Sequence, residues 1–322
     1  MWIDREFKGS DPAGISIHSG LVPPPPNWKM DYLQMEPSSN QGECQDILFS
    51  GLFLRSAKIQ TTLGMSGCGE NERYIFALLS NTRGTARLNG SPLPEGLAAV
   101  CGFQPFEVVL PPTDMFGMII SRKIMREYMN EVEGFAEPEW MQDGIHTIST
   151  QKSILNAIRM THHLVARQIE DPCTLIDFDR RRSVIFSIMN IISSIIIESI
   201  SDSKIDYLWQ HRFQVVRRVR EYIMERIKEP IKIGEICRDI GVSRRALQYI
   251  LQDVLGTNPA TFVRLMRLNM ARRDFLENEN SFKVKDVVDR WGFWHPSRFS
   301  GEYRQMFEEL PSETLRRLRP NK

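Results

Sequence analysis

The sequence lacks the short motifs with which enzymes hold a phosphate group, activate a nucleophile or bind zinc. It has no glycine-rich phosphate loop, no G-x-S-x-G elbow and no pair of closely spaced cysteines. Its six histidines form no H-x-H pair with a downstream ligand, and the adjacent His162 and His163 would point about 100° apart on a helix. We therefore expect no catalytic centre, no metal site and no cofactor.

Cysteine is scarce. The five cysteines, Cys44, Cys68, Cys101, Cys173 and Cys237, are far apart and follow no cleavable signal segment. This usage is typical of a reducing compartment rather than of a disulfide framework. We expect a cytoplasmic protein.

Long hydrophobic runs are also missing. The most apolar stretch consists of about seventeen mostly apolar residues within 179–200, so it is short for a bilayer that needs about 20. It is also interrupted by Ser187, Asn190, Ser193 and Glu198. We expect no membrane span here, but a buried helix between domains or in a dimer. The residues predicted to mediate dimerisation recur at helical spacing: Ile185, Ile188, Met189, Ile192 and Ile196.

The net charge of +1 hides an asymmetry along the chain. Up to His211 there are 18 Lys and Arg against 25 Asp and Glu, and beyond it 23 against 15. Only the C-terminal part therefore has the positive surplus that favours a polyanionic partner. A surplus of this size also occurs on proteins that bind no nucleic acid.

Residues 1–45 are rich in Pro, Ser and Gly, including the run Pro23 to Pro26, and we expect an arm or loop there. Residues 46–204 are expected to form one domain, which begins with short apolar stretches separated by turns. These turns are predicted at Ser66-Gly67, Asn89-Gly90 and Pro111-Pro112. Asn89-Gly90 suits a type I′ hairpin, because both residues tolerate a positive φ. The pattern predicts an antiparallel β domain, followed by helices at RKIMREYMNEVEG and across Thr147 to Glu170.

Residues 212–319 contain two similar segments at a spacing of 51 residues, IGEICRDIGVSRRALQYILQDVLG and VKDVVDRWGFWHPSRFSGEYRQMF. In each, apolar residues at i, i+3, i+4 and i+7 precede a glycine, Gly241 or Gly292, that can end a helix in the left-handed conformation. A second helix follows each glycine, with Ser243 suited to cap the first and Pro296 suited to the opening turn of the other. The pattern predicts an all-α domain of two helix-turn-helix units.

The outer faces of the second helices carry hydrogen-bond donors that can reach base edges or phosphates. We predict that double-stranded DNA is bound by Arg244, Arg245, Gln248, Tyr249 and Gln252 in the first unit and by His295, Ser297, Arg298, Ser300 and Arg304 in the second. The long apolar segment between the units predicts a rigid helix. Such a spacer could hold the two recognition helices about 34 Å apart, in successive major grooves.

These residues resemble the AraC/XylS family of transcription regulators from Val215 to Arg319. The resemblance rests on the L-G-x-x-P sequence ending at Pro259, on R-L-x-x-A-R from Arg267 to Arg272, and on Gly292-Phe293 followed by Ser297, Phe299, Ser300, Tyr303, Phe307 and Pro311. Cys237 and Val288 stand where the family has a small alanine, and Glu308 replaces a glycine.

A weaker resemblance joins the stretch from Tyr74 to Gly90, YIFALLSNTRGTARLNG, to the cupin-like domain that precedes the DNA-binding part in this family. The resemblance implies an α+β protein, a homodimer that binds promoter DNA, and control at the N-terminal domain by a small-molecule effector or protein partner, with RNA polymerase as a further contact. It does not separate activation from repression. The alternative is a protein-interaction module with no specific DNA target.

Overall fold

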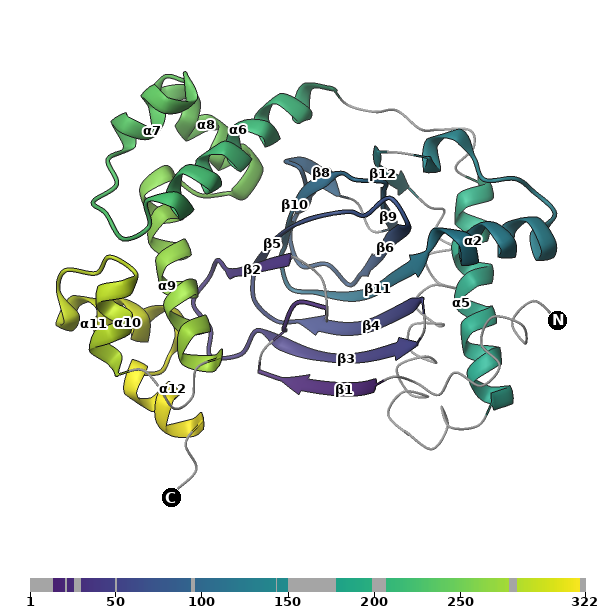
Figure 1. Cartoon of the computed structure of the whole chain (residues 1–322), viewed down its shortest axis with the longest axis horizontal. Helices are drawn as coiled ribbons and strands as arrows, with labels where there is room; N and C mark the ends of the chain where they lie inside the picture. Colours follow the sequence, from purple (N-terminus) through teal and green to yellow (C-terminus); the bar gives the residue numbers. More distant parts are fainter. Residues whose placement is uncertain are drawn as a thin grey trace.

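The structure is a computed structural model that describes residues 14–20, 22–25, 30–49, 51–93, 96–142, 144–149, 178–198, 207–277 and 283–318. Its N-terminal region (residues 14–198) is built on antiparallel β-sheets, and its C-terminal region (residues 207–318) is helical. The predicted order, an antiparallel β part followed by an all-α part, is therefore confirmed. Figure 1 shows the C-terminal helices on one side of the sheets, with α2 and α5 on the other.

Two antiparallel sheets form the N-terminal region. The seven-stranded sheet has the order β1 (Gly14–Ser19), β3 (Gly42–Phe49), β4 (Leu52–Ile59), β11 (Thr113–Ser121), β6 (Arg73–Ser80), β9 (Gly96–Cys101) and β12 (Gly144–Ser149). The five-stranded sheet has the order β2 (Met30–Gln34), β5 (Leu63–Cys68), β10 (Pro105–Leu110), β7 (Ala86–Leu88) and β8 (Ser91–Leu93). Because strands alternate their side chains between two faces, the sheets bury one shared core that includes Ala57 of the larger sheet and Leu63 of the smaller.

The hairpin predicted at Asn89-Gly90 is confirmed. These two residues join β7 to β8 with φ angles of 52° and 90°, the positive values that a type I′ turn requires. Pro111 and Pro112 lie between β10 and β11, also as predicted.

Three local predictions differ from the structure. The expected arm over residues 1–45 contains β1, β2 and the start of β3, and each of these strands pairs with a partner strand. Ser66-Gly67 lies inside β5 rather than in a turn. A helix is expected from Thr147 to Glu170, but residues 147–149 are the last residues of strand β12. Residues 150–170 lie outside the described part of the chain.

Helices cover the outer face of the seven-stranded sheet. They are α2 (Arg122–Tyr128), the π-helix η1 (Met129–Glu133), the 3-10 helix η2 (Glu139–Met141) and α5 (Phe178–Glu198). The five residues predicted to mediate dimerisation, Ile185, Ile188, Met189, Ile192 and Ile196, are at most 3% exposed, in one core with this sheet and α2.

These five side chains are therefore occupied within their own chain, because the apolar pattern of α5 is satisfied by the sheet. A contact between α5 and a second copy would have to use its other side, where Phe186 and Ile197 are exposed. None of the helices in the described residues has the length and hydropathy of a membrane span.

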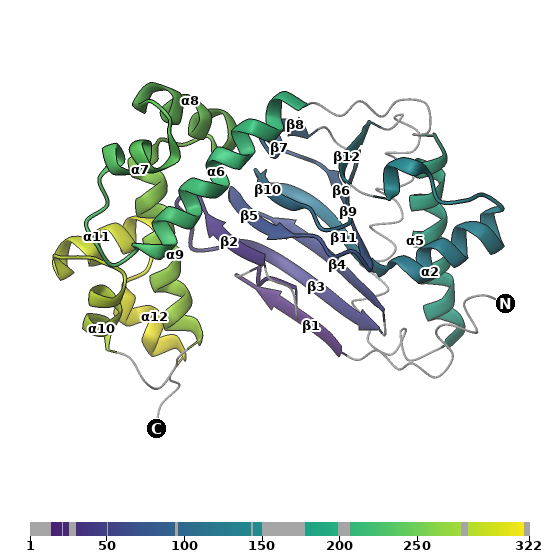
Figure 2. The same cartoon turned by 45° about the horizontal axis from the view of Figure 1, so that its top comes forward.

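The C-terminal region consists of α6 (Tyr207–Glu225), α7 (Ile233–Ile240), α8 (Arg244–Leu255), α9 (Pro259–Glu277), α10 (Val284–Arg290), α11 (Pro296–Phe307) and α12 (Pro311–Leu318). In both views α7 and α8 lie towards one end of α9, and α10, α11 and α12 towards the other. Figure 2 also shows β2, the edge strand of the smaller sheet, next to this helical region. Leu33 of β2 is buried in the same core as α9.

Candidate nucleic-acid interface

The first helix-turn-helix unit is α7, a glycine turn and α8. Ile236 and Ile240 bury one side of α7, and Gly241 ends it in the left-handed conformation at φ 77°. The Ser243 side chain then accepts a hydrogen bond from the backbone N–H of Ala246 at 3.1 Å and caps α8 as predicted. Two neighbouring residues therefore specify the turn: Gly241 adopts the left-handed conformation that ends α7, and Ser243 caps the start of α8.

The exposed side of α8 carries all five side chains predicted for the first unit. Arg244, Arg245, Gln248, Tyr249 and Gln252 are exposed, whereas the opposite side of the helix is buried. The ring of Tyr249, 62% exposed, lies 5.6 Å from the guanidinium carbon of Arg245. Such a contact between exposed side chains contributes about 0.5–1 kcal/mol.

Arg244 lies back over α7 rather than straight outward. A Cβ placed on Gly234 would approach its guanidinium nitrogen to 2.9 Å, so the missing side chain makes room for the arginine. Arg244, Lys232 and Arg238 line one open surface hollow. Glu235 also lines the hollow and pairs with Lys232 at 3.6 Å, so cations outnumber acids by three to one. Such a hollow at the start of α8 suits a phosphate group better than a base edge.

The second unit, α10 and α11, is joined by a turn with a tight contact. Gly292 has φ 69°, and a Cβ at this position would lie 2.8 Å from the carbonyl oxygen of Ile227. Glycine is therefore required for its conformation and for its lack of a side chain. Val288 is fully buried beside it, so the family's alanine is replaced here by a residue of the core.

Four of the five residues predicted on the second unit, His295, Ser297, Arg298 and Arg304, are exposed. Ser300 is half-buried, and its hydroxyl donates to the carbonyl oxygen of Pro296 at 3.0 Å, which leaves it less available to DNA. His295 is the N-cap residue of α11, but its side chain makes no capping hydrogen bond.

Arg298 is held by an acidic neighbour. Its Nε lies 2.9 Å from Oε1 of Glu302, whose other oxygen lies 3.2 Å from Nε of Arg264 on α9. Glu302 thus connects the recognition helix to the spacer helix. The charge pattern of the sequence did not point to this residue as a site residue.

The sequence motifs do not point to Trp294 either. It is 69% exposed and directly precedes His295 at the start of α11. The sequence signal that points to Trp294 is its position, because it lies in a polar turn, outside the amphipathic pattern of the flanking helices. A large apolar side chain at such a position does not contribute to the hydrophobic core.

The helix α9 joins the two units and is held to both. It has 19 residues and is therefore about 28 Å long. Arg267, near its middle, donates to the carbonyl oxygens of Ile227 at 3.1 Å, Glu229 at 2.5 Å and Gly292 at 3.2 Å. The first two carbonyls lie between α6 and α7 and the third lies in the second unit, so one guanidinium fixes the units to each other.

Comparison with known proteins places these helices in a known domain type. Residues 236–317 match the family model described as "Helix-turn-helix domain". The chain is 38% identical over 103 residues to the probable thc operon regulatory protein of Rhodococcus erythropolis. The matched segment covers 32% of this chain and 31% of that protein. The chain is 34% identical over 101 residues to the XylDLEGF operon transcriptional activator 1 of Pseudomonas putida, covering 31% and 30%.

Among solved structures, a probable AraC family transcriptional regulator from Rhodopseudomonas palustris CGA009 is 34% identical. The match covers 33% of this chain and 99% of that one, with a TM-score of 0.31. The chain spans about a third of the length of these two curated relatives.

Proposed function

We propose that this chain is a DNA-binding transcription regulator of the AraC/XylS type, because residues 236–317 match the helix-turn-helix family model and the relatives over this region are operon regulators. We further propose that α8 and α11 enter successive major grooves of promoter DNA. The observation that carries the proposal is that each recognition helix exposes a row of donors and buries its other side. The rigid link through α9 and Arg267 supports simultaneous binding by both.

We assign base or backbone contacts to Arg245, Gln248 and Tyr249 in the first unit and to Ser297, Arg298 and Ser300 in the second. Arg244, Gln252, His295 and Arg304 complete the surface, with Arg244 on a phosphate because of the basic hollow around it. Trp294, beside His295, packs on the sugar-phosphate backbone at the start of α11.

We further propose that the protein acts as a dimer in the cytoplasm and that its N-terminal region, a cupin-like domain that adds β1 and β2 to the predicted residues 46–204, controls presentation of the DNA-binding domain over 212–319. The cysteines described as free thiols, Cys44, Cys68, Cys101 and Cys237, support a reducing compartment. Sedimentation of the full chain tests the dimer. If α5 contributes to it, Ile197→Glu on the exposed side dissociates the dimer, and unchanged sedimentation would exclude this helix.

The test of DNA binding is fluorescence anisotropy of the full chain on the intergenic duplex upstream of its own gene, titrated with salt and with an unrelated competitor duplex. We expect specific binding whose affinity falls steeply as salt rises, because phosphate contacts release counterions. Gln248→Ala should cost about 1–3 kcal/mol at one site position, whereas Arg244→Ala should weaken all sequences alike. Arg83→Ala, an exposed arginine of the N-terminal region, is the matched control.

The alternative, a protein-interaction module, predicts weak binding to any duplex, with no sequence preference. It would be favoured if Gln248→Ala and Arg298→Ala left both affinity and preference at the wild-type level. A small-molecule effector and a contact with RNA polymerase remain part of the proposed regulation, and a shift of the duplex affinity on adding a candidate effector would identify the former.

A further inference from the structure

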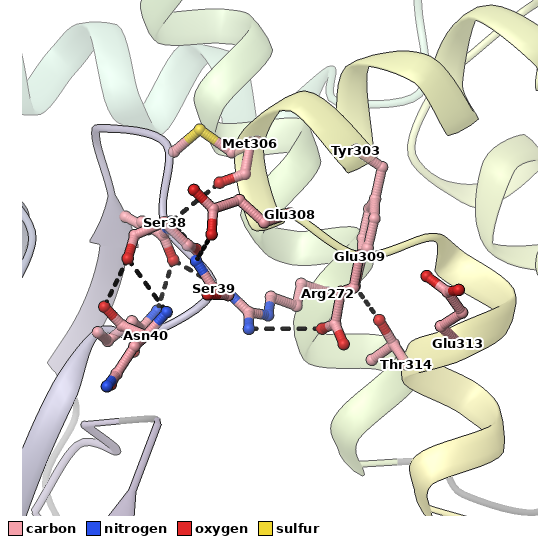
Figure 3. A network of polar contacts seen from close by, with 12 residues as sticks. Ser38, Ser39, Asn40, Arg272, Tyr303, Met306, Glu308, Glu309, Glu313 and Thr314 are labelled. Carbon is pink, nitrogen blue, oxygen red and sulfur yellow. Dashed lines mark hydrogen bonds and ion pairs between the residues drawn. The ribbon is translucent and has the colours of Figure 1, made fainter.

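The N-terminal region donates hydrogen bonds to the C-terminal end of α11, the second recognition helix. The last carbonyls of a helix have no partner within it. In α11, the carbonyl oxygen of Met306 accepts a hydrogen bond from the backbone N–H of Ser38 at 3.0 Å and one from Nε2 of Gln34 at 3.1 Å. Both donors lie more than 260 residues away in the chain, and Figure 3 shows Ser38 beside this helix end.

Glu308, which replaces the glycine of the family motif, takes part in the same contact. It is the C-cap residue of α11, and its φ of 58° lies in the left-handed region that favours glycine. Its carboxylate oxygen accepts a hydrogen bond from the backbone N–H of Ser39 at 3.1 Å (Figure 3). Glycine would adopt this conformation more easily but would offer no acceptor, so the glutamate retains backbone strain together with a contact to the N-terminal region.

The same segment is fastened to α9. The side-chain amide of Asn269 accepts the N–H of Gln34 at 2.8 Å and donates to its carbonyl oxygen at 3.0 Å, which closes the outer edge of β2 as a neighbouring strand would. Oε1 of Gln34 also accepts a hydrogen bond from Arg272 at 3.0 Å. Gln34 is fully buried, so this one residue ties α9 to the end of α11.

These contacts leave the proposed DNA surface open. Ser297, Arg298 and Arg304 remain exposed while the segment is docked, because it meets the end of α11 opposite to Ser297. The contacts can therefore fix the direction of the recognition helix without covering it. A helix that is already oriented loses less freedom when it binds.

We propose that residues 34–40 of the N-terminal region are a brace that orients α11 against α9, and that Glu308 and Gln34 are positioning residues for DNA recognition by the second unit. The consequence for DNA rests on the proposed function. The brace itself does not, and it can be measured without DNA.

The test is hydrogen exchange of the full chain, wild type against Glu308→Gly. If Glu308 affects only its own backbone conformation, the amide protons at the end of α11 should exchange more slowly in the variant, because glycine relieves the left-handed strain. The brace predicts the opposite. The peptide containing Ser39 should exchange about tenfold faster, because its N–H loses the carboxylate acceptor. The last turn of α11 should also exchange faster, because the loosened segment no longer holds it. Gln34→Met removes a different donor, the one to the carbonyl oxygen of Met306, and should also make the last turn of α11 exchange faster.

Glu43→Gly, which changes the same residue type on β3 outside the brace, is the control and should leave both peptides unchanged. Exchange at wild-type rates in both brace variants, or slower exchange at the end of α11 in Glu308→Gly, would overturn the brace.

The DNA arm uses a duplex selected from a random pool by the wild-type chain. The brace predicts that Glu308→Gly weakens binding about threefold to tenfold and reduces discrimination only in the half-site read by α11. Tighter binding would overturn the positioning role and show that the segment restrains the helix instead. If the wild-type chain selects no sequence while the exchange results stand, the DNA-binding proposal fails and the brace does not.

Discussion

Arg267 directs its donors to main-chain carbonyls rather than to a carboxylate. Burial lowers the pKa of its guanidinium, and no acid offsets this cost within the three contacts described for it. The residue therefore acts as a structural bracket in a region where exposed arginines are expected to bind phosphate. A count of cations alone would misassign it.

Arg267→Lys should lower the free energy of unfolding by about 2–3 kcal/mol, because one ammonium cannot reproduce a planar group that reaches three carbonyls. Urea unfolding of the full chain measures this change. Arg264→Lys, on an exposed part of the same helix, should shift the free energy by less than about 1 kcal/mol. Equal effects of the two substitutions would show that Arg267 has no bracketing role.

The thiol of Cys44 should be unreactive in the folded protein. Burial raises its pKa to about 11, with Arg55 opposing and Asp46 adding to the shift. At pH 8 it should carry about a hundredfold less thiolate than an exposed cysteine. Iodoacetamide labelling followed by mass spectrometry should modify the partly exposed Cys68 well before Cys44. Labelling of both at one rate would contradict the burial of Cys44.

The same shift has a consequence for stability. Because the folded-state pKa is raised, the contribution of this thiol is fully present below its ordinary value of 9.0, and it is lost as the pH rises towards about 11. The free energy of unfolding should therefore fall less between pH 9.0 and about 11 in Cys44→Ser than in the wild type.

At the scale of elements, the two helix-turn-helix units were predictable and the first two strands, β1 and β2, were not. A helix, its cap and its terminating glycine are encoded within about a dozen residues, so Ser243 and Gly241 could be assigned directly. The strands β1 and β2 depend on pairing with β3 and β5, which no local pattern reveals, and the prolines near Pro23 favoured an arm instead.

The apolar helix α5 shows the same limit in another form. Its spacing correctly indicated a buried side, since Ile185 and Ile192 are almost fully buried. Periodicity specifies that a surface is covered but not what covers it, and here the partner is the protein's own sheet. Trp294 and Glu302 were missed because their importance depends on where the turn and α9 lie in three dimensions.

The two turn glycines allow a matched substitution. Gly241→Ala and Gly292→Ala both place a Cβ on a left-handed residue, which costs about 1–2 kcal/mol. Only the second also forces a Cβ to 2.8 Å from a backbone oxygen, whereas nothing lies within 4 Å of the first. Thermal unfolding should therefore show the larger loss for Gly292→Ala. An equal loss would mean that the Ile227 loop moves aside freely.

At the scale of the whole molecule, the two regions share a polar and apolar interface. Arg273 of α9 pairs with Asp31 of β2 at 2.9 Å, and Arg220 of α6 pairs with the buried Glu107 of β10. Together with Asn269 and Leu33, these contacts join the smaller sheet to α6 and α9 of the helical region. The regions should unfold as a coupled system.

Asn269→Leu tests this coupling. It leaves the buried N–H and carbonyl of Gln34 without their partner, which should cost about 2–4 kcal/mol. Calorimetry should then resolve two transitions in place of one. Asn190→Leu, at an exposed position of α5, makes the same chemical change and should leave a single transition. One unaltered transition in both variants would exclude Asn269 as a coupling residue.

The contact between Gln34 and Met306 spans 272 residues of chain. At about 5–20 residues per second, a ribosome that has made the glutamine needs on the order of 15–55 s more to make the methionine. The N-terminal sheets can fold during this interval, but the edge of β2 must wait for its partner with its backbone groups unpaired. Newly made protein therefore passes through a stage in which this strand is open to chaperones or to another nascent chain, and the docking of α9, which carries Asn269, ends it.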